Sequence, residues 1–208
     1  ADEYLAGRHL WYLATHLTRS CDGKWFLLDG ELTSHWFVAL GDATGQTQQI
    51  KVVREFDRRH NHAQFAPHDP NLLLIAHDQY RDPITGRFSH HEQRVHVMDL
   101  ADGRYECLTP HITCRAYHGA CHEWWLADGR VGYIDYDTGV WVTDARPVPG
   151  QRQHHHIWRE PLCHAHSDPT GRWSIQAWCG VVWMWPSVQP HLCPNSGRSW
   201  PIQAFFVA

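Results

Sequence analysis

Histidines are the residues of this 208-residue chain whose number and spacing most plainly suggest chemistry, since the sequence contains 19 of them. A neutral imidazole binds divalent transition metals, and its pKa near neutrality also lets it act as a base. A subset lies beside recurring polar turns of the sequence. The members of this subset are His62, His77, His118, His122, His164 and His166.

The spacing in LCHAHSDPTG places two of these rings together, because alternate residues of a strand share a face. His164 and His166, joined by His122, predict a site for manganese, zinc, iron or nickel. The alternative is that these are half-buried turn histidines that donate to backbone carbonyls, which suits His118 better than metal binding. Cys163 is either a thiolate ligand or, more in keeping with its type, a buried inert thiol.

The other histidines have no such constellation, and we assign them, His9 and His16 among them, to structure or surface. The run His154–His156 in PGQRQHHHIW predicts a solvated loop. The sequence contains no serine nucleophile elbow, phosphate-binding loop or dinucleotide fingerprint.

Composition indicates one folded domain over residues 1–208, because 43% of the residues are apolar and 19% are charged. The net charge is −4 and the basic residues are scattered singly, so we expect no nucleic-acid partner. No stretch reaches the ~18 consecutive apolar residues of a membrane helix, and the first residues are too polar for a signal sequence. Seven cysteines without a CxxC pair favour a reducing compartment, whereas a first residue of Ala also suits an exported chain, so cytoplasm, periplasm and secretion all stay open. The oligomeric state is left open as well.

We expect a repeated sequence pattern to position these residues. In each repeat, a polar turn is followed by a strand in which apolar residues alternate with polar ones. Its copies are SCDGKWFLLDG, PHDPNLLLIAHD, LADGRVGYIDYD and DPTGRWSIQAWCG. A further strand follows each copy, in SHWFVALGDATGQ, RVHVMDLADGR, TGVWVTDA and, less regularly, WPIQAFFVA. Two hairpins per unit of ~40–50 residues predict an all-β propeller of four-stranded blades, with about four to five units in this chain. A β-sandwich is the alternative, and residues 83–93 are expected to form a loop that projects from one face.

The propeller prediction bears directly on the histidines. The innermost strands of a propeller begin near the same end of its channel, so residues that precede successive turns converge there. We therefore expect His122 and His164 to approach each other although they are far apart in the sequence.

These phrases resemble the oligogalacturonate lyases, which are β-propeller polysaccharide lyases with ulvan lyases among their relatives. The stretches that carry the resemblance are HAQFAPHDPNLLLIAHD, RVHVMDLADG, CHEWWLADGRVGYIDY and CHAHSDPTG. HEWW with its turn, and the step from His62 to His77, are the most specific of them. Family members have seven blades and would need ~280–315 residues. The resemblance therefore leaves three alternatives for this chain: a smaller ring, a portion of a longer protein that is incomplete relative to the family, or a ring closed by assembly with another chain.

The resemblance implies β-elimination on an oligosaccharide that contains uronate. It assigns His77 as the Brønsted base and places a manganese ion, with zinc or calcium as alternatives, on His122, His164 and His166. It matches Arg94 to an arginine that meets the uronate carboxylate. A metal or arginine on that carboxylate stabilises the enediolate that forms when the C5 proton is removed.

Substrate contacts complete the prediction. His62 is a candidate substrate-binding residue, and Trp124 and Tyr133 are candidate sugar platforms, although aromatic residues of propeller strands more often belong to the core. The role of Glu123, which follows the predicted metal ligand His122, is left open. A non-catalytic propeller that binds protein or glycan partners is the main alternative function, followed by an unrelated metal-dependent hydrolase.

Overall fold

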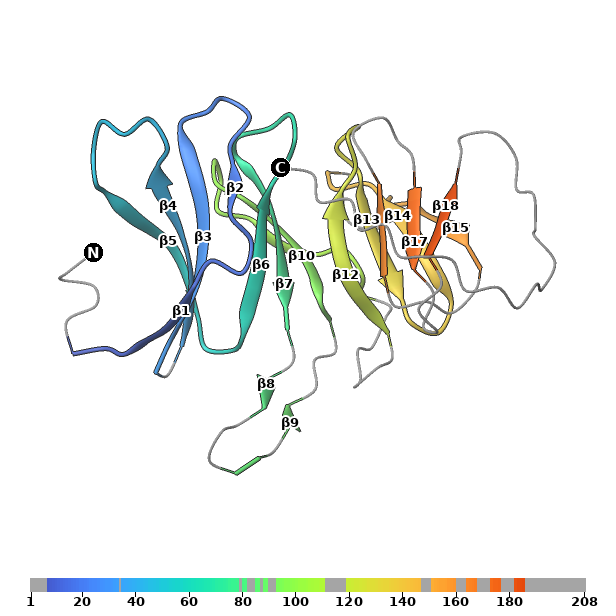
Figure 1. Cartoon of the computed structure of the whole chain (residues 1–208), viewed down its shortest axis with the longest axis horizontal. Coiled ribbons are helices and arrows are strands. Elements are labelled where there is room, and N and C mark those ends of the chain that lie inside the picture. Colours follow the sequence, from blue (N-terminus) through green and yellow to red (C-terminus); the bar gives the residue numbers. More distant parts are fainter. Residues whose placement is uncertain are drawn as a thin grey trace.

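A computed structural model describes residues 7–33, 35–78, 80–81, 85–86, 88–89, 93–110, 119–146, 151–159, 164–167, 173–176 and 182–185. All regular structure in this part of the chain is β, arranged as successive antiparallel sheets that stand side by side (Figure 1). The all-β propeller prediction is confirmed. No helix capable of crossing a membrane occurs among the described residues.

Each sheet follows the chain as one blade. Blade 1 contains β1 (Leu10–Leu13), β2 (Thr18–Arg19), β3 (Trp25–Leu32), β4 (Trp36–Asp42) and β5 (Ile50–Phe56), in the order β1-β3-β4-β5 with β2 also on β3. Blade 2 contains β6 (His60–Phe65), β7 (Leu72–His77), β10 (Val95–Asp99) and β11 (Tyr105–Cys107). Blade 3 contains β12 (Ala120–Trp125), β13 (Val131–Asp135), β14 (Gly139–Thr143) and β15 (His154–Trp158). Blade 4 contains β16 (His164–Ser167), β17 (Trp173–Gln176) and β18 (Val182–Trp185).

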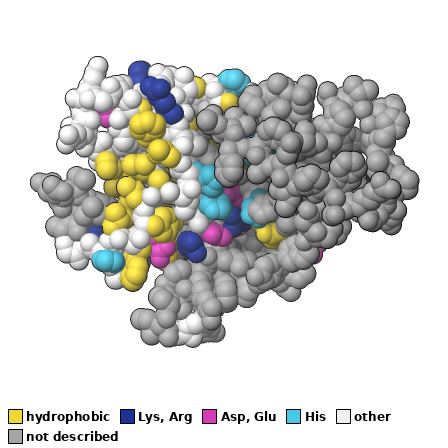
Figure 2. Space-filling model, in the orientation of Figure 1, with side chains coloured by type: hydrophobic (Ala, Val, Ile, Leu, Met, Phe, Trp, Pro, Cys, Tyr) yellow, Lys and Arg dark blue, Asp and Glu magenta, His cyan; other side chains and the backbone are white. Residues whose placement is uncertain are grey.

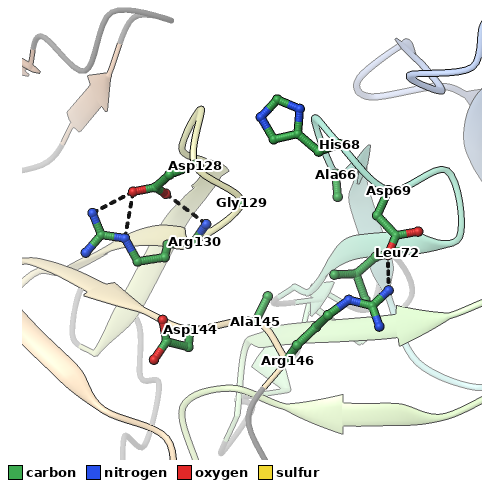
Figure 3. A pocket seen from close by; sticks show the side chains of 10 residues that line it. All are labelled: Ala66, His68, Asp69, Leu72, Asp128, Gly129, Arg130, Asp144, Ala145 and Arg146. Atoms are coloured by element: carbon green, nitrogen blue, oxygen red, sulfur yellow. Dashed lines mark hydrogen bonds and ion pairs between the residues drawn. The ribbon is translucent and has the colours of Figure 1, made fainter.

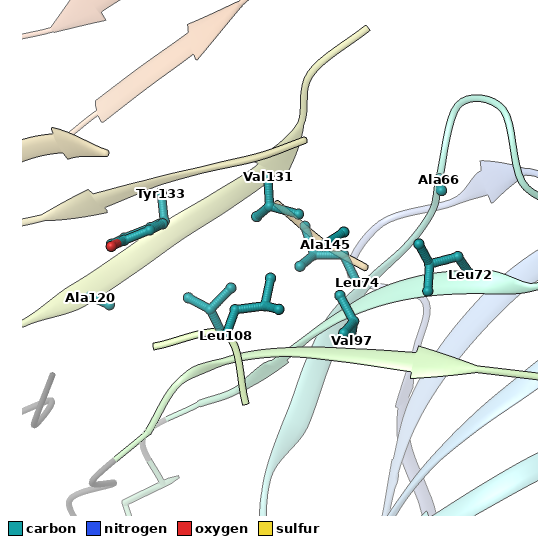
Figure 4. Close-up of a cluster of buried hydrophobic side chains, with 10 residues drawn as sticks. Ala66, Leu72, Leu74, Val97, Leu108, Ala120, Val131, Tyr133 and Ala145 are labelled. Carbon is teal, nitrogen blue, oxygen red and sulfur yellow. The ribbon is translucent and has the colours of Figure 1, made fainter. Parts of the chain in front are cut away.

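Apolar cores hold neighbouring blades together. Between blades 2 and 3, the side chains of Leu74 and Val97 pack in one buried cluster with Val131 and Tyr133 (Figure 4). A second cluster joins blades 1 and 2 through Leu27, Val38 and Ile75, among others. Because residues of blade 2 belong to both clusters, its two faces are covered by its neighbours, and β10 is buried along its whole length.

The inner strand of blades 1, 2 and 3 is interrupted at the same level. The pairing of β6 with β7 slips between Asn61 and Gln64, and the pairing of β12 with β13 slips between Cys121 and Trp124. In blade 1 the interruption separates β1 from β2, which both pair with β3. Such β-bulges bend the strand and redirect side chains, and they are common beside active sites.

Histidine occupies the bulge in blades 2 and 3. His62 has a φ of 52° and His122 a φ of 41°, both in the left-handed region that non-glycine residues rarely adopt. Strained backbone of this kind persists where the surrounding structure holds it, and it is concentrated at functional sites. The shared conformation makes His62 and His122 structural equivalents in adjacent blades.

Two local predictions differ from the structure. The run His154–His156 is not a loop but the body of β15, where the His156 ring stacks on Trp141 at 4.0 Å and His154 Nδ1 lies 3.1 Å from the Tyr133 hydroxyl. An edge strand tolerates polar residues when alternate side chains find such partners. Within residues 83–93, Phe88–Ser89 forms β9, which pairs with β8 (Tyr80–Arg81) as a small ribbon extending from blade 2 (Figure 1).

Candidate active site

A buried ion pair joins blades 2 and 3 at the end where their inner strands begin. Arg94, just before β10, donates from Nε to Glu123 Oε2 at 3.0 Å and from Nη1 to Asp78. The side chains of Arg94 and Glu123 are only 9% and 0% exposed. Burial alone would raise the pKa of Glu123, but the charge of Arg94 and the contact with His62 lower it to about 2. Glu123 is therefore a permanent buried anion at neutral pH.

His62 rests against this anion and reaches solvent. Its Nδ1 atom lies 3.2 Å from Glu123 Oε1 and 3.3 Å from Arg94 Nη2, and its side chain is 26% exposed. The carboxylate favours the tautomer in which Nδ1–H donates to Glu123. Nε2 is then the atom that meets a ligand, so His62 is an oriented imidazole of the type used in acid–base catalysis.

Blade 1 adds a histidine that the sequence analysis assigned to structure or surface. The exposed His16 ring lies edge-on to His62, with ring centroids 4.7 Å apart and planes at 82°. The neighbouring Thr15 fixes the approach, because its hydroxyl accepts from the His62 amide at 2.8 Å and its own amide donates to Asp29 at 2.6 Å. A signal was present in the sequence, since His16 precedes Gly23 by the same interval that separates His122 from Gly129.

His77, the predicted base, lies at the end of β7 within a stack of rings. Its ring is parallel to that of His60 at 4.6 Å and tilted toward that of His96 at 6.1 Å. Burial lowers the pKa of His77, with a further lowering from Arg58, so the imidazole is neutral at neutral pH. Its Nε2 atom is buried, however, which leaves His62 better placed to meet a substrate.

The predicted metal ligands are described only in part. His122 Nε2 lies 3.1 Å from the Tyr136 hydroxyl, and the His166 ring stacks on Trp124 at 6.0 Å. His164 begins β16, but its side chain lies outside the described residues. Within the described part of the chain, no group of three or more His, Cys, Asp or Glu side chains is arranged to hold a metal. The metal set therefore stays a prediction.

The two predicted sugar platforms are buried. Trp124 is 4% exposed and Tyr133 0% exposed, and both pack in cores. Trp124 fits there because Gly132 faces its ring, where a Cβ atom would come within 2.6 Å. Neither ring offers a face to solvent, so burial does not support the prediction that they stack on sugars.

A pocket of about 410 Å³ lies at the opposite end of blades 2 and 3, where their inner hairpins turn. Arg130 pairs with Asp128 on one side of it, and Arg146 pairs with Asp69 on the other (Figure 3). None of the predicted site residues lines this pocket. The candidate site is instead the histidine end, where histidine, acidic and basic side chains gather near the middle of the face in Figure 2.

Solved structures with the same fold include enzymes and other propellers. The chain superposes on an oligogalacturonate lyase in complex with manganese with a TM-score of 0.61 at 12% identity, over 79% of this chain and 47% of that one. For an oligogalacturonate lyase from Vibrio parahaemolyticus the TM-score is 0.57 at 13% identity, over 81% and 52% of the two chains. For the Dos1 propeller it is 0.53 at 14% identity, over 81% and 40%.

No protein-family model matches the sequence, and no curated protein matches it. The chain spans about half the length of the two lyases that it resembles. At these identities the similarity concerns the architecture alone, and function has to be argued from the site. The chain is thus similar in fold to the β-propellers, oligogalacturonate lyases among them.

Proposed function

We propose that this protein is a lyase that cleaves uronate-containing oligosaccharides by β-elimination. The observation that carries the proposal is the exposed His62 imidazole, held by a strained β-bulge against the buried anion Glu123. An oriented imidazole can exchange a proton with a substrate that is held against it. The similarity in fold to two oligogalacturonate lyases supports the same reaction class.

Arg94 has a different role in this proposal from the one that the resemblance implies. Its guanidinium is buried between Glu123 and Asp78, so its charge is already compensated by two carboxylates. We therefore assign it to positioning, since it holds Glu123 where that carboxylate orients His62. Because the charges of this buried network compensate one another, the exposed imidazole of His62 is left to meet the substrate.

A divalent metal, manganese in the first instance with zinc or calcium as alternatives, belongs to the proposal as well. His122, His164 and His166 would hold it. When bound, it would supply positive charge to the uronate carboxylate as the C5 proton leaves. A lyase of similar fold is in complex with manganese, which supports this choice.

The test is the ultraviolet absorbance of the unsaturated product. The purified protein is mixed with oligogalacturonate, or with ulvan, in the presence and absence of manganese. We expect absorbance to grow with at least one of these substrates, and His62→Asn, which tolerates the left-handed backbone, to slow this growth about 10²–10⁴-fold. His77→Gln is the matched comparison: an equal loss there would restore His77 as the base.

A non-catalytic propeller is the second candidate, supported by the architectural match to the Dos1 propeller, whose TM-score of 0.53 is only slightly below those of the two lyases. It predicts no absorbance change with any uronate polymer and no stoichiometric metal in protein purified without a histidine tag. Elemental analysis of that sample therefore separates the two functions.

A further inference from the structure

The β-bulge that carries His62 takes two backbone amides out of the regular ladder of blade 2. The pairing of β6 with β7 slips between Asn61 and Gln64, so His62 and Ala63 together face a single residue of β7. Such a bulge disrupts the ladder locally and leaves its extra residue unpaired within the sheet. Because Ala63 is 0% exposed and a buried amide without an acceptor is costly, the bulge needs acceptors from outside its own sheet.

Blade 1 supplies these acceptors. The Thr15 hydroxyl accepts from the His62 amide at 2.8 Å, and the Asp29 carboxylate accepts from the Ala63 amide at 3.1 Å. Thr15 is itself bound to Asp29, because its amide donates to one carboxylate oxygen at 2.6 Å and its hydroxyl donates to the other. Asp29 is 0% exposed, so a continuous set of hydrogen bonds runs from the interior of blade 1 to the bulge of blade 2.

The backbone of blade 1 is shaped for this contact. Ala14 lies in the interruption between β1 and β2 and has a φ of 64°, in the same left-handed region as His62. Its amide donates to the backbone carbonyl of Asp29. A non-glycine residue keeps such a conformation where the surrounding structure compensates the strain. The turn at Ala14 therefore brings Thr15 onto Asp29 and against His62.

The direction of the His62 ring depends on the backbone that carries it. The side chain is 26% exposed, and its printed polar contacts all involve Nδ1, which lies 3.2 Å from Glu123 Oε1 and 3.3 Å from Arg94 Nη2. A rotation or shift of the bulge would move the ring away from both groups. A displacement of about 1 Å in a reacting group can lower a rate ~10²-fold, so the support of the bulge bears directly on activity.

We propose that Thr15 and Asp29 are positioning residues for His62, which they hold through the backbone amides of the bulge. This inference rests on the proposed function, since it concerns the residue that meets the substrate there. Neither Thr15 nor Asp29 takes part in a proton transfer. They fix the bulge in the conformation that keeps the His62 imidazole against Glu123.

A related contact occurs one blade further along the chain. Gln64 of blade 2 donates from Nε2 to the backbone carbonyl of Glu123 at 3.1 Å, within the bulge of blade 3, and to that of His62 at 3.4 Å. The bulges of blades 2 and 3 are thus both held by side chains of the preceding blade. The support of His62 by blade 1 follows this common arrangement.

The chain contains a matched control for Thr15. Thr18 makes the same kind of bond across the same interface, since its Oγ1 accepts from the Phe65 amide at 3.0 Å. Phe65, however, pairs regularly with Leu73 and lies outside the bulge. Thr15→Val and Thr18→Val each replace with a methyl group a hydroxyl that joins blades 1 and 2, but only the first removes a contact to His62.

Initial rates on oligogalacturonate and on ulvan oligosaccharides measure the effect. We expect Thr15→Val to lower kcat about 10–10²-fold with little change in KM, because the imidazole moves while the substrate surface stays. Thr15→Ser, which keeps the hydroxyl, should restore most of the rate, and Thr18→Val should keep the wild-type kcat. Asp29→Asn should lower kcat at least as far as Thr15→Val, because an amide in place of the carboxylate cannot accept from all of these donors.

Two kinetic results overturn the proposal: a wild-type kcat in Thr15→Val, or an equal loss of kcat in Thr18→Val. The first shows that the bulge does not need Thr15. The second shows that any weakening of the interface between blades 1 and 2 has the same consequence, which is a structural role and not a positioning role.

A second measurement does not depend on turnover. Amide hydrogen exchange followed by NMR should show the His62 amide protected in the wild type, in Thr15→Ser and in Thr18→Val, and exchanging about tenfold faster in Thr15→Val. An unchanged exchange rate in Thr15→Val overturns the positioning contact even when the protein eliminates uronates. If the wild type eliminates neither substrate, the proposed function fails, and the exchange rates still decide whether blade 1 holds the bulge.

Discussion

Both ends of blades 2 and 3 carry pairs of an arginine with an aspartate or a glutamate, but the arginine is buried at one end and half-exposed at the other. At the histidine end, the side chains of Arg94 and Glu123 are 9% and 0% exposed. At the turn end, the Arg146 side chain is 50% exposed and its partner Asp69 is 29% exposed (Figure 3). Buried charges depend on their partners, whereas exposed charges are solvated with or without them. The same type of ion pair is therefore buried in the candidate site at one end and lies on the surface at the other.

The largest effect that this difference predicts follows from Arg94→Met. The substitution leaves the Glu123 carboxylate buried without its main counter-charge, and we expect the free energy of unfolding to fall by about 3–5 kcal/mol. Urea-induced unfolding followed by tryptophan fluorescence measures this change. Adding Glu123→Gln to the same protein should recover part of the loss, because one buried charge is then removed. A loss below about 1 kcal/mol would show that the buried pair behaves like a surface pair.

A smaller loss in the free energy of unfolding is expected when the pH is lowered. The pKa of Glu123 is about 2 in the folded protein against an ordinary value of 4.5, so the unfolded chain takes up the proton first. The stabilisation is complete above pH 4.5 and is lost as the pH falls toward 2. Unfolding free energies measured over this range should decline for the wild type. In Glu123→Gln the starting stability should be lower and this part of the decline absent; an unchanged decline would assign it to other carboxylates.

The smallest effect is expected at the turn end. Arg146→Met removes the ion pairs that a half-exposed guanidinium makes with Asp69 and with Asp99, a buried carboxylate that keeps Arg104 as a second partner. The free energy of unfolding should therefore change by less than about 1 kcal/mol. The same urea titration, at low and at high salt, serves as the measurement. A loss comparable to that of Arg94→Met would abolish the distinction between the two ends.

Much of the fold could be predicted from local sequence patterns. The alternating strand after each polar turn was predicted in all four blades, because turn residues and strand alternation are local features of a sequence. The run His154–His156 shows the limit, since its polar neighbours suggested a loop while Tyr133 and Trp141 provide partners that make it a strand. Those partners lie on other strands, so the residues of the run itself do not indicate that they form a strand.

Only part of the candidate site could be predicted from the sequence. His62 was among the predicted residues, whereas His16 was set aside and Glu123 had no assigned role. The missing step is the contact between His16, His62 and Glu123, which come from three different blades. The burial of Arg94, on which its proposed positioning role rests, is likewise a property of the packed blades.

The sequence by itself determined that the chain is an all-β protein of repeated hairpins and that a subset of its histidines lies near the polar turns along the chain, because both features depend on short-range spacing. Only the tertiary structure decided which histidines meet and which carboxylate they meet. That decision depends on the bulges that shift the inner strands of adjacent blades, and on the exclusion of water from the space between those blades.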